Sequence, residues 1–124
     1  MKLSTLCNKV RCDVAWAYDN PNMDDMPAGS RHYRVTLHYK RRQMTVPFSC
    51  GPAIEREPSA EDVLECLLSD SYGAYQTFEQ WCSDLGYDSD SRKAERTYRA
   101  VVRQDGQTRR LLGADYDKFI EAER

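Results

Sequence analysis

The sequence has little of what fibrous, disordered or membrane proteins require. Only six of its 124 residues are glycine and five are proline, which excludes collagen and low-complexity disorder. No apolar run approaches the roughly 18 residues of a membrane-spanning helix. The first seven residues lack the apolar core of a signal peptide. With 40% hydrophobic and 31% charged residues, the composition is that of one globular domain, residues 1–124, and we expect it in the cytoplasm.

Cysteine is also too irregularly spaced for a metal or redox site. The chain has five cysteines, an odd number, and no two of them have the C-x-x-C spacing of zinc ribbons and redox centres. Cys66 and Cys82 fall in apolar helical stretches, where a free thiol behaves as a small hydrophobic side chain. We therefore expect reduced thiols that serve the structure.

The signatures of the commonest enzymes are missing. The sequence contains no G-x-x-x-x-G-K-[ST], G-x-G-x-x-G, H-E-x-x-H or G-x-S-x-G motif. Asp84, Asp88 and Asp90 resemble part of a calcium loop, but the required glycine and closing glutamate are absent, so helix capping is the preferred interpretation. We expect no metal and no cofactor.

The two histidines offer only a weak case for catalysis. His32 and His38 have the even spacing that places them on one face of a strand, and Cys50 follows downstream. A Cys–His pair can be imagined, but no feature orients a histidine or marks an activated thiol. Exposed strand residues explain both histidines equally well, and we expect no enzyme.

The first half of the chain, residues 9–50, alternates apolar and polar residues as β-strands do. Three runs have this period of two, and each places an apolar row on one face of a sheet: 10–18, 33–39 and 44–48. A long loop is expected over 19–30, and a hairpin turn near 40–43. Pro47 cannot donate a hydrogen bond to a neighbouring strand, which favours an edge position.

The second half, residues 58–122, has the spacing and caps of helices. Ser59 can cap the first helix, and Thr77 with Gly86 can begin and end the second. The longest helix is predicted over 91–104, interrupted at Asp105-Gly106, and a short terminal helix follows over 116–122. The fold class is therefore α+β: a three-stranded antiparallel sheet covered on one face by three to four C-terminal helices.

The apolar rows of sheet and helices should meet in one core. The inner face of the longest helix is expected to carry Ala94, Tyr98, Val101 and Val102, because these positions fall on one arc at 100° per residue. The other members of the expected core are Trp16, Tyr33, Val35, Leu37, Val46, Phe48, Val63, Leu64, Leu67, Phe78 and Trp81.

Charge is distributed in blocks, although the net charge is only −2. Residues 31–42 carry five basic residues and no acidic one, and residues 92–110 carry seven basic residues against two acidic ones. Residues 55–90 carry ten acidic residues against one arginine. Such blocks indicate charged faces on the folded protein.

Two of these blocks form candidate binding faces. Arg92, Arg96, Arg99 and Arg103 share one arc of the longest helix, and such a stripe suits phosphates or an acidic protein surface. Glu57, Glu61 and Glu65, joined by Asp62, have helical spacing and could mimic nucleic acid. The alternatives are a solvated helix face, ordinary capping acids, or two faces that pair with each other.

Several of these segments together resemble a family of small uncharacterised proteins from phages and prophages. The resemblance covers roughly residues 31–113 and is most specific in the run Gly-Tyr-Asp-Ser-Asp-Ser-Arg-Lys-Ala-Glu at 86–95. It also includes Pro-Ser-Ala-Glu-Asp-Val-Leu at 58–64 and Phe-Glu-Gln-Trp-Cys at 78–82. The family supplies no catalytic residues, and it implies an accessory phage protein in the cytoplasm of a bacterial host.

Two classes of function follow from this resemblance and from the charged faces. The first is an inhibitor of a bacterial defence complex, above all an anti-CRISPR that binds a CRISPR–Cas effector and blocks its nucleic-acid binding or cleavage. The second is a nucleic-acid-binding accessory protein of phage replication or recombination, using the arginine stripe and the basic hairpin at 31–42. The near-neutral net charge counts mildly against the second class.

Overall fold

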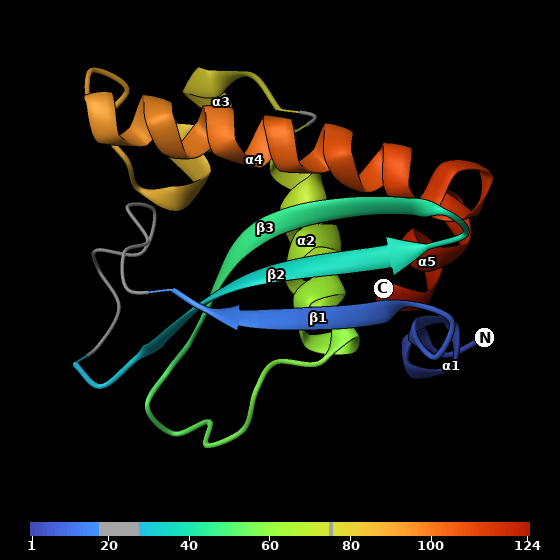
Figure 1. Ribbon diagram of the computed structural model, residues 1–124. Helices are drawn as coiled ribbons and strands as arrows, with labels where there is room; N and C mark the ends of the chain where they lie inside the picture. The colour runs from blue at the N-terminus through green and yellow to red at the C-terminus, as the bar shows by residue number, and fades with distance from the viewer. Residues whose placement is uncertain (18–27, 75) are drawn as a thin grey trace.

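An antiparallel sheet in the first half of the chain carries helices from the second half on one of its faces (Figure 1). The computed structural model describes residues 1–17, 28–74 and 76–124. Its elements are α1 (Leu3–Cys7), β1 (Arg11–Trp16), β2 (Arg31–Tyr39), β3 (Arg42–Cys50), α2 (Ala60–Ala74), α3 (Phe78–Leu85), α4 (Arg92–Leu112), a 3-10 turn (Gly113–Asp115) and α5 (Tyr116–Glu123). The predicted α+β class is confirmed.

The sheet has the order β1-β2-β3, so β2 is central. Val35 of β2 lies opposite Val14 of β1 and Val46 of β3, which aligns the three apolar rows on one face. Pro47 lies on β3, an outer strand, as its missing N–H predicted. The first strand was expected to reach residue 18 and a loop to follow, but residues 18–27 lie outside the described residues.

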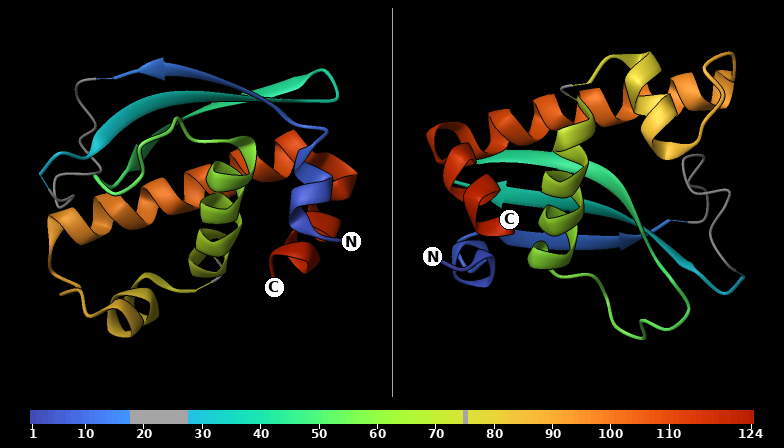
Figure 2. Two further views of the ribbon diagram at one scale, coloured as in Figure 1. Left: turned by 90° about the horizontal axis from the view of Figure 1, so that it is seen from below. Right: turned by 180° about the vertical axis from the view of Figure 1, so that it is seen from behind.

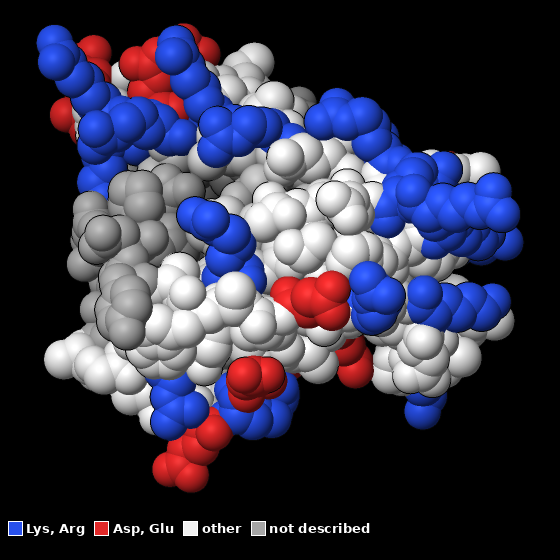
Figure 3. All heavy atoms as spheres, viewed as in Figure 1, with Lys and Arg blue, Asp and Glu red and all other residues white. Residues whose placement is uncertain are grey.

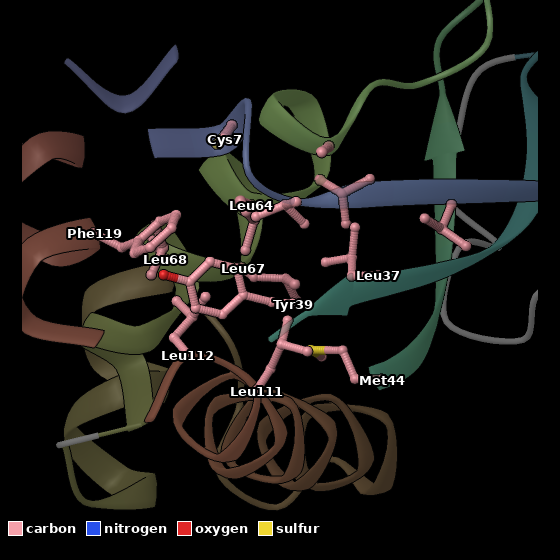
Figure 4. Close-up of a cluster of buried hydrophobic side chains, with 14 of the residues drawn as sticks. Cys7, Leu37, Tyr39, Met44, Leu64, Leu67, Leu68, Leu111, Leu112 and Phe119 are labelled. Atoms are coloured by element: carbon pink, nitrogen blue, oxygen red, sulfur yellow. The ribbon is translucent and has the colours of Figure 1, made fainter. Parts of the chain in front are cut away.

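The apolar face of the sheet packs against α2 and α4, which cross on that one side of the sheet (Figure 2). Leu37 and Met44 from the sheet meet Leu64 and Leu67 from α2 and Leu111 from α4 (Figure 4). Helices α1 and α5 pack on α2 at the other side of the same core. The short helix α1 was not predicted, because its five residues offer too little periodicity to detect.

The expectation of one core is wrong, because the buried apolar residues form two clusters. Trp81, Cys82 and Ala94 bury one another at the junction of α3 and α4, with Phe78 and Tyr98 packed against them. Helix α3 packs on α4 and lies on the side of α4 away from the sheet (Figure 2). Trp16, at the end of the apolar row of β1, is 56% exposed and meets the ring of Tyr33 edge-on.

Helix α4 is longer than the sequence predicted and runs to Leu112 without a break at Asp105-Gly106. The Asp105 carboxylate accepts hydrogen bonds from Arg109 Nε, 2.9 Å away, and from Tyr116 OH, 3.0 Å away. A satisfied side chain does not compete for the backbone, so the helix continues. Val102, expected on the inner face, is exposed, whereas Ala100 before it and Thr108 and Leu111 further along the helix are buried.

Candidate functional site

The segment between α3 and α4 fixes where the arginine-bearing helix begins. Gly86 ends α3 with a φ of 76°, and Tyr87 stacks on Trp81 with ring centroids 5.1 Å apart. The Asp88 carboxylate accepts the Asp90 N–H, and Ser91 Oγ accepts the N–H of Ala94 as the N-cap of α4. The Gly-Tyr-Asp run therefore has a structural role: it sets the start and orientation of α4.

The four predicted stripe arginines lie together on α4 and are all exposed. Arg99 pairs with Glu95 one turn earlier and still leaves 75% of its side chain exposed. Among the described residues, Arg92, Arg96 and Arg103 have no ion-pair partner. The structure thus brings these side chains to one solvent-facing row, as their spacing predicted.

The row is one arginine longer than the sequence analysis allowed. Because α4 continues past residue 104, Arg110 falls on the same arc, seven residues after Arg103. From Arg92 to Arg110 the helix advances about 27 Å at 1.5 Å per residue. Because a break was predicted at Asp105-Gly106, the sequence analysis did not assign Arg110 to this helix.

A second group of cations sits at the tip of the β2–β3 hairpin. The strands are joined by Lys40 and Arg41, which have φ values of 45° and 68°. Two left-handed residues make the tight turn that suits the twist of a hairpin, and Asn-Gly is its usual sequence. Two basic residues in this conformation store backbone strain at the tip.

The hairpin tip is fixed to the helices on both sides. Tyr39 OH lies 2.6 Å and Lys40 Nζ lies 2.7 Å from Oδ2 of Asp115, which precedes α5. The hydrogen bond from Lys40 is the main reason that the pKa of Asp115 falls to about 2. On the other side, Arg42 Nε donates to the carbonyl of Leu111, 2.9 Å away, near the end of α4.

The hairpin tip and the arginine row meet beside the end of α4. A hollow of about 590 Å³ is lined jointly by Arg42 and Gln43 from β3 and by Gln107 and Arg110 from α4. In Figure 3, basic side chains follow α4 along one edge of the molecule and reach a second group at the end where β2 and β3 join. We call this surface the basic edge; its members are Arg92, Arg96, Arg99, Arg103, Arg110, Lys40, Arg41 and Arg42.

The predicted acidic row is less coherent. Glu57 lies in the loop before α2, and only Glu61 and Glu65 belong to the helix. Asp62 forms an ion pair with Arg56, and the hydrogen bond from Arg56 is the main reason that the Asp62 pKa falls to about 2. Asp62 also accepts a hydrogen bond from the backbone N–H of Ser59, and Ser59 Oγ accepts one from the backbone N–H of Asp62. This reciprocal cap confirms that the helix starts at Ser59.

The two charged faces do not neutralise each other. Within the described parts of the chain, no ion pair joins an arginine of the row to Glu57, Glu61 or Glu65. Glu61 instead lies near the thiol of Cys7. Burial raises the pKa of this thiol to about 11, and the Glu61 carboxylate adds to the effect. Both faces therefore remain available to solvent.

The histidines and Cys50 lie on opposite faces of the sheet. His32 Nδ1 is 2.6 Å from Ser49 Oγ, and His38 Nε2 is 2.9 Å from Oδ2 of Asp13, both on the uncovered face, the one opposite the helices of the described residues. Cys50 faces the core, where it is buried. Its pKa is raised, first by burial. The sheet therefore separates the two groups that a Cys–His pair would need.

A second hollow lies beside the hairpin tip, and sequence reasoning missed it. It measures about 340 Å³ and is lined by Arg11, His38, Tyr39, Lys40, Arg41, Arg42 and Gln43. Arg11 and His38 come from neighbouring strands and are paired directly across the sheet. Only the strand register brings Arg11 to the tip, and single-strand periodicity carries no signal for it.

A third hollow is an apolar groove of about 450 Å³ between β3, α2 and α4. Val46, Leu67 and Ala100 line it, and Glu65 and Asp70 contribute carboxylates. Cys66 also lines this groove and is exposed, which corrects the expectation that it packs as a buried hydrophobic residue. Burial raises the pKa of Asp70.

Among residues 1–17, 28–74 and 76–124, no group of three or more histidine, cysteine, aspartate or glutamate side chains is arranged to hold a metal ion. In the same residues, no helix combines the length and apolarity needed to cross a membrane. Comparison with protein-family models, curated proteins and solved structures finds no match to this chain.

Proposed function

We propose that the protein is a non-catalytic binding protein that holds the phosphate backbone of a nucleic acid along its basic edge. The observation that carries the proposal is the junction of the arginine row of α4 with the anchored hairpin tip around Arg42 and Arg110. In line with the resemblance to phage proteins, we place this activity in the cytoplasm of a bacterial host, as an accessory to phage nucleic-acid metabolism.

The spacing and chemistry of the edge support this proposal. Arg92, Arg96, Arg99 and Arg103 follow one another at about one helical turn, or 5 Å, and Arg110 follows two turns later, so each can reach a different phosphate. Guanidinium groups hold phosphates with two parallel hydrogen bonds. The concentration of eight basic side chains along the basic edge answers the objection from net charge, because the ligand meets the local field of that edge.

The defence-inhibitor hypothesis uses the same surface differently. In that case the basic edge would contact the RNA or an acidic patch of a CRISPR–Cas effector. Mimicry of nucleic acid by the glutamates is the weaker form, because Glu57 stands outside α2 and Asp62 is paired with Arg56. Binding to free nucleic acid and binding to an assembled effector are therefore compared in one experiment.

The experiment is fluorescence anisotropy with labelled single-stranded and duplex DNA and RNA at low salt. Reversal of Arg96 and Arg103 to glutamate should weaken binding at least about tenfold, since each lost phosphate contact reduces the counterion release that drives association. The matched control is Lys2→Glu with Arg34→Glu, which changes the net charge equally at exposed positions outside the edge. Affinity only for a purified effector, with none for free nucleic acid, would overturn this proposal and favour the inhibitor.

A further inference from the structure

The hollow beside the hairpin tip brings basic side chains from β1, from the β2–β3 turn and from β3 to one concave site. Its volume of about 340 Å³ is in the range of small-ligand pockets. Among the described residues, no carboxylate lines it, whereas three arginines, one lysine, an imidazole and an amide do. We propose that this hollow binds a phosphomonoester, the terminal phosphate of a nucleic-acid strand or of a free mononucleotide.

The charge of the hollow selects a monoester over the diester inside a strand. A monoester carries about −1.5 to −2 charge at neutral pH and three terminal oxygens. Lys40 is already paired with Asp115 and Arg11 with Asp13, which leaves Arg41 and Arg42 as the lining cations without an ion pair among the described residues. A diester has one negative charge and cannot satisfy the same number of cations.

Part of the lining is held in place before any ligand arrives. Oδ2 of Asp13 lies 2.9 Å from His38 Nε2 and 3.5 Å from Arg11 Nη2, so one carboxylate ties both side chains to the sheet. Arg42 is tied to α4 through the carbonyl of Leu111. A rigid set of donors loses less entropy on binding than flexible surface lysines do.

Backbone strain at the tip supports a role in binding. Arg41 has a φ of 68°, where glycine would be more stable. Among the described residues its side chain has no ion-pair partner, so no ion pair offsets the strain. Strained residues persist where the ligand requires them.

The test uses Arg41→Gly, which removes the guanidinium and also relieves the strained turn. The probes are a short oligonucleotide with and without a 5′-phosphate, and adenosine 5′-monophosphate compared with adenosine, by titration calorimetry. We expect the phosphorylated probe of at least one pair to bind the wild type about tenfold more tightly than its partner. Arg41→Gly should reduce that preference below about twofold while raising the melting temperature. The control Arg34→Ala, an exposed arginine outside the hollow, should keep the preference.

The two pairs of probes separate the two sources of the phosphate. A preference only among oligonucleotides indicates a strand end, and in that form the inference rests on the proposed function. A preference only among mononucleotides indicates a nucleotide site that is independent of it. Equal binding of both members of both pairs would overturn the inference and leave the proposed function intact. A preference unchanged in Arg41→Gly would also overturn it.

Discussion

Lys40 Nζ lies 2.7 Å from Oδ2 of Asp115, and this ion pair joins the tip of the β2–β3 hairpin to the start of α5. The two residues are 75 positions apart in the chain. Because Tyr39 donates to the same oxygen, one carboxylate fixes the direction in which the hairpin tip points. The position of the cations at the tip therefore depends on this contact.

The first prediction concerns the pH dependence of that contact. The Asp115 pKa is lowered from 3.8 to about 2, so its ionised form stabilises the folded state. This contribution is complete above about pH 4 and is lost as the pH falls through about 2. Asp115→Asn should therefore be less stable than the wild type near pH 6, and the difference should shrink between pH 4 and pH 2. Urea unfolding measures the difference in the free energy of unfolding between the two proteins, and a difference that does not change with pH would contradict the assigned ion pair. Asp62, whose pKa is also lowered, titrates equally in both proteins, so its effect cancels in this difference.

The second prediction is a pair of glycine substitutions with opposite signs. Gly113 has a φ of 55°, and a Cβ atom there would lie 2.9 Å from Arg42 Nη1. Gly113→Ala should cost about 1–3 kcal/mol from the backbone conformation alone. Gly106 lies inside α4, where a Cβ would meet only Arg110 Nη1 at 3.7 Å, so Gly106→Ala should stabilise by about 0.5–1 kcal/mol. Thermal unfolding measures both, and a stabilising Gly113→Ala would show that the backbone there is not left-handed.

The third prediction tests the core. Leu67 is buried between the sheet and the helices, and Leu67→Ala should reduce the free energy of unfolding by about 2–5 kcal/mol. The neighbouring exposed residue supplies the control: Glu65→Ala should change stability by less than about 0.5 kcal/mol. Similar effects of the two changes would mean that α2 presents a different face to the sheet.

The fourth prediction concerns thiol reactivity. The pKa values of all five cysteines are raised, first by burial, and that of Cys7 reaches about 11. Since the thiolate is the reactive form, alkylation at pH 7.5 should be slower than that of a free thiol. Cys66 is exposed and should react first. Rapid labelling of Cys50, read by mass spectrometry, would reopen the question of a nucleophilic cysteine.

Much of the fold could be predicted because its signals are local. The period of two predicted the strands, Pro47 predicted an outer strand, and Ser59 and Thr77 cap the helices they were expected to cap. The break at Asp105 was wrong because its carboxylate is satisfied by Arg109 and by Tyr116 of the next helix. The second contact depends on tertiary packing, which the local sequence does not contain.

The candidate site divides in the same way. The spacing of the arginines on α4 is a property of one helix, so Arg92, Arg96, Arg99 and Arg103 could be grouped from sequence. Their junction with the hairpin depends on how α4 packs on β3, and the hollow beside the tip depends on the register between β1 and β2. The clustering of Trp81 with Tyr98 away from the main core likewise depends on how α3 packs against α4.

The most direct test of the proposed function is the salt dependence of nucleic-acid affinity for the wild type and for Arg96→Glu with Arg103→Glu. For a duplex, the logarithm of the association constant should fall linearly with the logarithm of salt concentration, with a slope of about −0.9 per phosphate contacted. Contacts by half of the basic edge would give a wild-type slope of about −4, and the double reversal should make the slope shallower by about two contacts. Equal slopes for the two proteins, or no dependence on salt, would contradict binding along the basic edge.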